Sequence, residues 1–271
     1  MNNDIKIHPL ILKIKDEIIE NRRYFHKYPE LSFQEFNTSK VIEEKLTQMG
    51  IKVKSKIAKT GLIADISGSK AGKMIALRAD MDALPIQETS NAPYKSVNDG
   101  VMHACGHDGH IAMLLGAANV INQRKDKLNG TVRLIFQPAE EGYAGATHMI
   151  DEGALDNVDE IYGIHLWNYQ KIGEIGVKSG PIMAAADMFE IEIIGKGGHG
   201  ATPHGTVDAV VVSSHLINSF QTIVSRNTNP IESTVVTVGM INGGYNFNII
   251  ADKVILKGTT RAYTEKNRKL I

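Results

Sequence analysis

The sequence has little of several features that would assign a class of protein by themselves. Its 271 residues include one cysteine and one tryptophan, and 30 basic residues balance 30 acidic ones, so the formal net charge is +0. One cysteine excludes an intrachain disulfide, and neutrality argues against nucleic acid as a partner. No apolar run approaches membrane length, and polar residues interrupt the first ten positions, so no membrane span or signal peptide is visible. We therefore expect a soluble protein of a reducing compartment, with the cytoplasm as the default.

What the sequence does contain is a dense group of metal-binding side chains at residues 102–110. The group comprises three histidines, the one thiol and an aspartate, namely His103, Cys105, His107, Asp108 and His110. Thiolate, imidazole and carboxylate groups are the ligands of zinc and its first-row neighbours. On a helix Cys105 and His107 would point about 200° apart, so both can reach one ion only from a turn. We interpret the segment as a metal site at a strand-to-helix turn, with Asp108 at the start of a helix over 111–121.

Each of these residues alone has a plainer interpretation. A sole cysteine is usually an inert buried side chain, and histidines often cap helices or line cores. Five such residues within nine positions favour the metal site over that alternative.

Two acidic residues follow a segment that is typical of a buried strand, residues 131–136. Glu140 and Glu141 are adjacent, and on a regular strand they would face opposite sides. At an irregular strand end one carboxylate can bind a metal while its neighbour moves protons. The alternative is a solvated pair of acids in a loop. His165, near the end of an apolar strand expected at 161–166, is by itself more typical of a core histidine than of a ligand.

Hydrophobic periodicity predicts two regions with different architecture. In the first, helices at 9–28, 36–49, 111–121 and 145–152 alternate with strands at 51–57, 62–66, 74–78, 132–136 and 161–166, which indicates a layered α/β domain. The carboxyl ends of its strands carry Asp80, Glu140, Glu141 and His165. After residue 185 a strand at 188–194, a helix at 207–226 and strands at 233–241 and 253–262 begin a βαββαβ pattern. We expect domains over residues 1–185 and 186–271.

The order and wording of many motifs resemble those of one family. The matching segments are Arg22-Arg23, 28–33 with Glu35 and Thr38, Thr60-Gly61, 76–86, 102–110, 136–141, 197–204, 248–250 and Thr260-Arg261. They resemble the metal-dependent amidohydrolases of the aminoacylase and glutamate-carboxypeptidase superfamily, in the branch of hippurate hydrolases, N-acetyldiaminopimelate deacetylases and auxin-conjugate hydrolases. The resemblance implies a zinc-peptidase-like α/β catalytic domain, with a mixed sheet covered by helices, and an α+β ferredoxin-like lid and dimerisation domain.

The resemblance also implies a role for individual residues. The implied metal ligands are Cys105, His107, Glu141 and His165, and Glu140 is the implied general base. Asp80 would orient a ligand through a hydrogen bond. His199 would lie across a dimer contact and stabilise an oxyanion, while Asn248 and Arg261 would bind the substrate carboxylate. The plainer alternatives are a glycine turn at 197–199 and a solvated strand charge at Arg261.

The implied reaction is hydrolysis of the amide bond of N-acyl amino acids, such as N-acetyl or benzoyl derivatives, in a homodimer formed through the lid. One or two divalent ions would be bound, with zinc, manganese, cobalt and nickel all open, and Cys105 stands where related branches have a bridging aspartate. Two alternatives remain: a dipeptidase, and an inactive homologue that only binds or dimerises.

The chain also departs from the family pattern. It stops at Ile271, inside what the resemblance makes the second lid helix, so the last lid strand and the returning part of the catalytic domain, with one more histidine ligand, are absent. We expect a fragment of a longer protein or a truncated product. Tyr28 stands where the branch usually has histidine, which we regard as a minor change.

Overall fold

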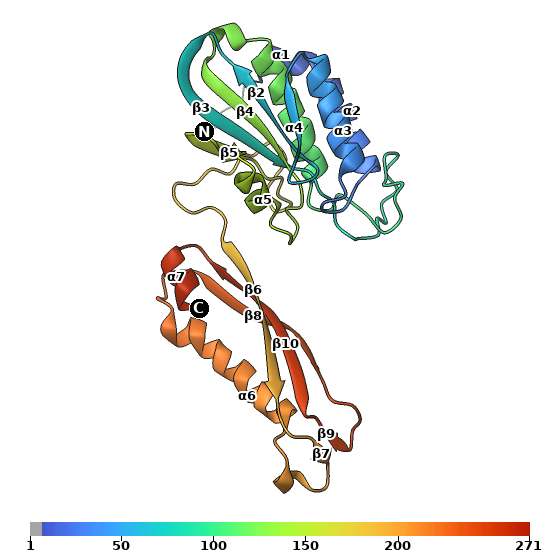
Figure 1. Ribbon diagram of the computed structural model, residues 1–271, viewed down its shortest axis with the longest axis vertical. Coiled ribbons are helices and arrows are strands. Elements are labelled where there is room, and N and C mark those ends of the chain that lie inside the picture. Colours follow the sequence, from blue (N-terminus) through green and yellow to red (C-terminus); the bar gives the residue numbers. More distant parts are fainter. Residues whose placement is uncertain (1–6) are drawn as a thin grey trace. The chain divides into compact units, whose positions relative to one another are not determined.

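The computed structural model describes residues 7–271, which form two compact units that divide between Lys171 and Ile172. The first unit holds a five-stranded sheet with helices, and the second holds a three-stranded sheet with one long helix (Figure 1). Each helix in this part of the chain is too short or too polar to cross a bilayer. The domain boundary expected after residue 185 lies fourteen residues after this division, at the start of β6 (Ala185–Ile194).

The sheet of the first unit combines antiparallel and parallel strands in the order β1-β2-β4-β3-β5. Strands β1 (Val53–Ile57) and β2 (Gly61–Ser67) are antiparallel, and β2 is antiparallel to β4 (Asn129–Gln137). Strand β3 (Lys70–Asp80) is parallel both to β4 and to β5 (Glu160–Gly163). The predicted mixed sheet is therefore confirmed. Because three parallel strands end together, their carboxyl ends form one edge, where open α/β sheets bind ligands.

Helices cover both faces of this sheet. They are α1 (Pro9–Lys13), α2 (Lys15–Lys27), α3 (Phe36–Gln48), α4 (His107–Asn122), a 3₁₀ turn (Lys125–Lys127) and α5 (Gly145–Asp151). Side chains alternate between the two faces of a strand, so Leu62 and Leu134 enter the larger core, which is enclosed by α2, α3 and α4. Ile63 and Ile135 enter a smaller core on the opposite face, with Met149 of α5.

Three local predictions differ from the structure. The helix expected at 9–28 is two helices that meet at Ile14. The strand expected at 161–166 ends at Gly163, which is paired with Arg78 of β3, so His165 lies beyond the strand. Helix α4 is preceded by the irregular segment 81–106 rather than by a strand. That segment contains Pro85 and Pro93, which cannot donate to a strand ladder.

The second unit contains the predicted order of strand, helix, strand and strand. Strand β10 (Lys253–Ala262) lies between β6 and β8 (Thr234–Gly243), and all pairs are antiparallel. Helix α6 (Ala209–Thr222) is capped by the Asp208 side chain, which accepts from the Val210 and Val211 N–H groups. The remaining elements are β7 (Gly198–His199), a 3₁₀ turn (Pro203–Gly205), a π turn (Ile223–Asn227), β9 (Ile249–Ile250) and α7 (Glu265–Leu270).

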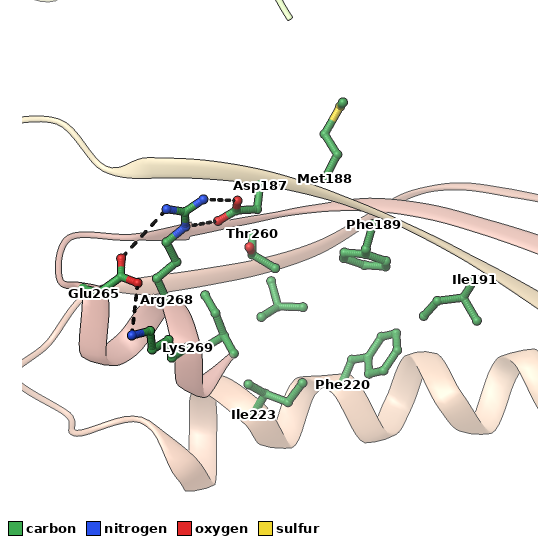
Figure 2. A pocket seen from close by; sticks show the side chains of 12 residues that line it. Asp187, Met188, Phe189, Ile191, Phe220, Ile223, Thr260, Glu265, Arg268 and Lys269 are labelled. Atoms are coloured by element: carbon green, nitrogen blue, oxygen red, sulfur yellow. Dashed lines mark hydrogen bonds and ion pairs between the residues drawn. The ribbon is translucent and has the colours of Figure 1, made fainter. Parts of the chain in front are cut away.

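The core of the second unit is small. Its buried residues are Ile193, Ala209, Val254 and Leu256. Beyond this core a cavity of about 490 Å³ lies between the sheet and helices α6 and α7. Figure 2 shows Phe189 and Phe220 facing each other across it, with ring centroids 5.9 Å apart. At its end Arg268 of α7 donates two hydrogen bonds, of 2.8 and 2.6 Å, to the carboxylate of Asp187, which fastens α7 to β6.

Candidate metal centre

The carboxyl ends of β3, β4 and β5 and the start of α4 bring the expected ligands together. Asp80 is the last residue of β3, Glu140 and Glu141 follow β4, and His165 follows β5; these ends can be followed in Figure 1. His107 is the first residue of α4, after Gly106, whose φ of 87° lies in the left-handed region that favours glycine. Four segments far apart in the sequence therefore converge on one site.

The distances place His107 at the centre of this group. Its Nε2 atom lies 3.6 Å from Asp80 Oδ2, 3.9 Å from Glu141 Oε1 and 4.0 Å from Glu140 Oε2. The Cys105 sulfur lies 3.5 Å from His165 Nε2. Three sets of ligand atoms each fall within 4.8 Å of one another, and His107 belongs to all three. These separations are a little longer than hydrogen bonds and leave room for a cation between the atoms.

Two histidines of the site are oriented by a contact between Nδ1 and a backbone carbonyl. His107 Nδ1 lies 2.8 Å from the Asp82 carbonyl oxygen, and His165 Nδ1 lies 2.6 Å from the Leu166 carbonyl oxygen. Because a carbonyl only accepts, each Nδ1 donates a hydrogen, and each Nε2 is the nitrogen left to face a metal. Metal-binding histidines are held in this way in proteins.

Unsatisfied polar atoms test whether the donor set fits a metal. Among the described residues, His107 Nε2 and Glu141 Oε1 are buried without any hydrogen-bond partner. An unpaired buried polar atom is costly, and a cation bound by both atoms would remove that cost. The residues present therefore fit a divalent ion, with sulfur, nitrogen and oxygen donors available.

Asp80 is held by two cationic or donor groups. Arg78 donates to its Oδ2 at 2.6 Å. His110, one turn after His107 on α4, lies with Nδ1 2.5 Å from Asp80 Oδ1, while its Nε2 accepts the Leu166 N–H at 2.9 Å. Burial alone would raise the pKa of Asp80, but the His110 hydrogen bond and the Arg78 charge outweigh it and hold the pKa well below its usual range. Asp80 is therefore a carboxylate.

The remaining charges make the site attract positive charge. Burial works to lower the pKa of His107, yet Asp82, the neighbouring Cys105 and the nearby carboxylates raise it to about 11, so positive charge is favoured at Nε2, from a proton or from a metal ion. Burial also raises the pKa of Glu140, and the charges of Glu141 and Asp80 add to the rise. Several acids thus surround one imidazole, and this is an arrangement that a divalent cation would balance.

The predicted residues of the second unit are not gathered at one place within that unit. His199 on β7 is paired with Ile249 on β9, so it lies beside Asn248, whose carbonyl accepts the Gly200 N–H at 2.8 Å. Arg261 lies eight residues after Lys253 on β10, roughly 26 Å along the strand at about 3.3 Å per residue. It donates to the Thr260 carbonyl at 2.8 Å.

Comparison with known proteins identifies the family. Residues 76–267 match the model of peptidase family M20/M25/M40. The chain belongs to this family. The superfamily expected from the sequence motifs is thereby confirmed.

Individual relatives agree with this assignment. The chain is 48% identical over 258 residues to an N-acetyl-L-cysteine deacetylase of Bacillus subtilis (strain 168), covering 95% of this chain and 62% of that protein. It is 44% identical over 267 residues to an N-acyl-L-amino acid amidohydrolase of Geobacillus stearothermophilus, covering 98% of this chain and 72% of that protein. The chain thus spans less than two thirds of the length of the first of these relatives.

A solved structure also matches. A dinuclear metal-binding peptidase of the M20 family from Bacillus subtilis superposes with a TM-score of 0.81 at 40% identity, covering 95% of this chain and 67% of that one. Two observations therefore support divalent metal binding by this chain: its membership of the M20 family and the ligand groups described above.

Sequence reasoning gave no role to Asp82 in this M20 site, and it named His110 only as a member of the 102–110 group. Asp82 is 1% exposed, and its carboxylate accepts from Ser32 Oγ at 2.7 Å and from the Glu141 N–H at 3.0 Å, while its carbonyl holds His107. His110 contacts Asp80 directly. In the sequence, both residues are indicated only by their proximity to predicted site residues. Asp82 lies two residues after Asp80, and His110 lies three residues after His107 on the same helix.

Two members of the 102–110 group are separate from the site. Asp108 pairs with His26 at 2.7 Å and with Arg22 at 3.0 Å. His103 belongs to none of the three ligand sets, and in the described structure neither of its ring nitrogens has a hydrogen-bond partner. Burial lowers its pKa to about 4. His103 is therefore a neutral buried imidazole.

Proposed function

We propose that this chain carries the metal-binding centre of an N-acyl amino acid amidohydrolase. The single observation that supports it best is the convergence of Cys105, His107, Glu141 and His165 beside Glu140. The deacetylase and amidohydrolase relatives supply the substrate class, an acyl group linked to the nitrogen of an amino acid.

The residues divide between holding a metal and moving protons. Cys105, His107, Glu141 and His165 would hold one or two divalent ions, with zinc, manganese, cobalt and nickel as candidates. A bound ion supplies Lewis acidity and lowers the pKa of water. Glu140 is the most exposed acid of the group, with 42% of its side chain accessible against 24% for Glu141. It can therefore reach a water and a substrate, take the proton of that water and deliver it to the leaving nitrogen.

A Glu140→Gln variant tests this assignment. Gln cannot accept the proton, so we expect kcat for an N-acetyl amino acid to fall by about 10² to 10⁴, while metal content measured by mass spectrometry stays unchanged. Glu152→Gln, which changes an exposed glutamate of the same unit, is the matched control. A Glu140→Gln protein that keeps most of its activity would contradict the role of the base. Faster cleavage of dipeptides than of N-acetyl substrates would favour the dipeptidase alternative.

We further propose that the second unit joins two copies of the chain and that His199 serves the site of the partner copy. His199 is exposed, and its Nδ1 accepts the Ala201 N–H at 3.1 Å, so its Nε2 can carry the hydrogen that an oxyanion needs. Arg261 would bind the substrate carboxylate through its two parallel donors. Asn248 lies beside His199, far from Arg261 of its own chain, and would reach that carboxylate from the partner copy.

Mixed dimers test this arrangement. His199→Ala alone should lower kcat about 10²- to 10³-fold. Co-expression of His199→Ala with Glu140→Gln should restore activity, because a mixed dimer holds one site with both groups if His199 acts on the partner. Action within one chain leaves every mixed dimer inactive, and a monomer in sedimentation experiments would contradict the dimer itself.

We place this enzyme in the cytoplasm. A cysteine ligand must remain a thiolate to bind metal, and a reducing compartment prevents its oxidation.

A further inference from the structure

A fully buried carboxylate lies behind the turn that carries Glu140. Glu35, at the start of α3, is 0% exposed. Its Oε1 accepts the Ala139 N–H at 2.9 Å, and its Oε2 accepts the Thr60 hydroxyl at 2.6 Å. Glu35 belongs to none of the three metal-ligand sets. The residue before Glu140 is therefore attached to a side chain from a segment 104 positions away in the sequence.

The turn that Glu35 contacts has an unusual backbone. Ala139 has a φ of 52°, in the left-handed region, which costs an alanine roughly 1 kcal/mol. Its carbonyl accepts the Gly145 N–H at 3.0 Å. A Cβ added at Gly145 would lie 1.9 Å from the Pro138 carbonyl oxygen, so this turn is closely packed. Such a conformation persists only where surrounding contacts hold it.

Two buried carboxylates hold alternate N–H groups of this turn. Glu35 accepts from Ala139, and Asp82 accepts from Glu141 at 3.0 Å. Glu140 lies between these two anchors. The backbone on both sides of the base is therefore fixed by side chains from other segments.

Burying a carboxylate is expensive unless hydrogen bonds offset the lost hydration. Burial raises the pKa of Glu35, and the Thr60 hydroxyl opposes that rise. An alanine or leucine at position 35 would avoid this cost but would leave the Ala139 N–H buried without an acceptor. Packing alone therefore does not explain why a glutamate occupies position 35.

We infer that Glu35 is a positioning residue, which sets the direction of the Glu140 carboxylate by holding the Ala139 N–H in its left-handed turn. This inference rests on the proposed role of Glu140 as general base. A misplaced base lowers the rate of proton transfer without removing the metal ligands. Glu35 is expected to affect kcat more than KM or metal content.

Glu35→Ala tests the inference, with Glu30→Ala as the matched control. Glu30 also lies before α3, and its carboxylate accepts the Asn37 and Thr38 N–H groups, away from the turn. We expect Glu35→Ala to lower kcat about 10- to 100-fold, as for a displacement near 1 Å, with KM and metal content close to wild type. Hydrogen exchange should accelerate in peptides over residues 137–142. Glu30→Ala should accelerate exchange only at the start of α3 and keep kcat.

Two further variants keep the test decisive if Glu35→Ala does not fold. Glu35→Gln retains an acceptor for Ala139 and a partner for Thr60, so kcat and exchange should stay near wild type. Gly145→Ala must displace the Pro138 carbonyl, so it should lower kcat and accelerate exchange at 137–142 although Glu35 is intact.

The inference is overturned if exchange at 137–142 is the same in Glu35→Ala and wild type, or if Gly145→Ala accelerates that exchange while kcat is unchanged. Loss of metal from Glu35→Ala would also overturn it, because the effect would then lie on the ligands. If the wild-type protein hydrolyses no N-acyl amino acid, the proposed function fails, and the exchange experiment still decides whether Glu35 holds the turn.

Discussion

At the centre of the first unit's candidate site four residues are buried and bonded to groups from other segments, whereas the candidate residues of the second unit are bonded to nearby backbone. Asp80, Asp82, His107 and His110 are each at most 3% exposed. His199 and Asn248 are exposed, and Arg261 is half-buried and donates to its own neighbour Thr260. The first unit thus fixes its functional groups before any ligand arrives.

The difference follows from how much core each unit has. The larger core of the first unit joins three helices to the sheet and supports a network of buried charges. The core cluster of the second unit consists of four buried residues. Buried charges require many surrounding donors and a rigid frame, so a preformed metal site belongs to the first unit. The exposed residues of the second unit are suited to meeting a substrate or another copy.

The largest effect is expected from a substitution that removes a core side chain of the second unit. Leu256 is fully buried on β10, and Leu256→Ala should cost roughly 2 to 5 kcal/mol in that unit. Hydrogen exchange should accelerate in β6, β8 and β10. Trp167 lies in the first unit, so the midpoint of denaturation followed by its fluorescence should not change. Leu134→Ala, in the larger core, should give the reverse result. Equal effects of both variants on both units would show that the cores are not independent.

A smaller effect is expected from the residue that orients the central histidine. Asp82→Asn should weaken zinc binding about 10- to 100-fold, because the Asp82 carboxylate lies 3.4 Å from His107 Nδ1 and accepts the Glu141 N–H. Groups that position metal ligands contribute this much to affinity. Competition with a chelator of known affinity measures it. Asp65→Asn, which removes a carboxylate paired with Arg133 in the same unit, should bind zinc as tightly as wild type. His199→Ala should also leave zinc affinity unchanged, and a loss there would contradict the assignment of the metal to the first unit.

The sequence predicted which residues form the site better than it predicted the contacts that join them. Strand ends carrying Asp80, Glu140 and Glu141 could be located, because hydrophobic runs end visibly and parallel strands share an edge. The separate roles of Asp80 and Asp82 could not be predicted from the sequence. That Asp80 orients a ligand stays a prediction, and the structure adds Asp82, whose carbonyl oxygen lies 2.8 Å from His107 Nδ1.

Contacts between distant segments were the least predictable. His103 looked equivalent to His107 and His110 in the sequence, yet it precedes the helix that presents the other two. Glu35 was visible as part of a motif, but its partner Ala139 lies 104 positions away, and no local pattern connects them. Likewise, β10 separates Arg261 from Asn248 in space although they are thirteen residues apart in the chain.

The smallest expected effect concerns how stability depends on pH in the first unit. The pKa of Glu35 is raised above its ordinary value of 4.5, mainly by burial. The folded state then binds this proton more tightly than the unfolded state, so the free energy of unfolding falls as pH rises from about 4.5 through the raised pKa. Gln carries no charge, so Glu35→Gln should become more stable relative to wild type over that window and then level off. Denaturation followed by Trp167 fluorescence from pH 4 to 8 measures the difference, with Glu190→Gln on β6 as a control for the loss of one charge. A constant difference between Glu35→Gln and wild type would mean that Glu35 titrates alike in the folded and unfolded chain, and burial in the first unit would then carry no electrostatic cost at this position.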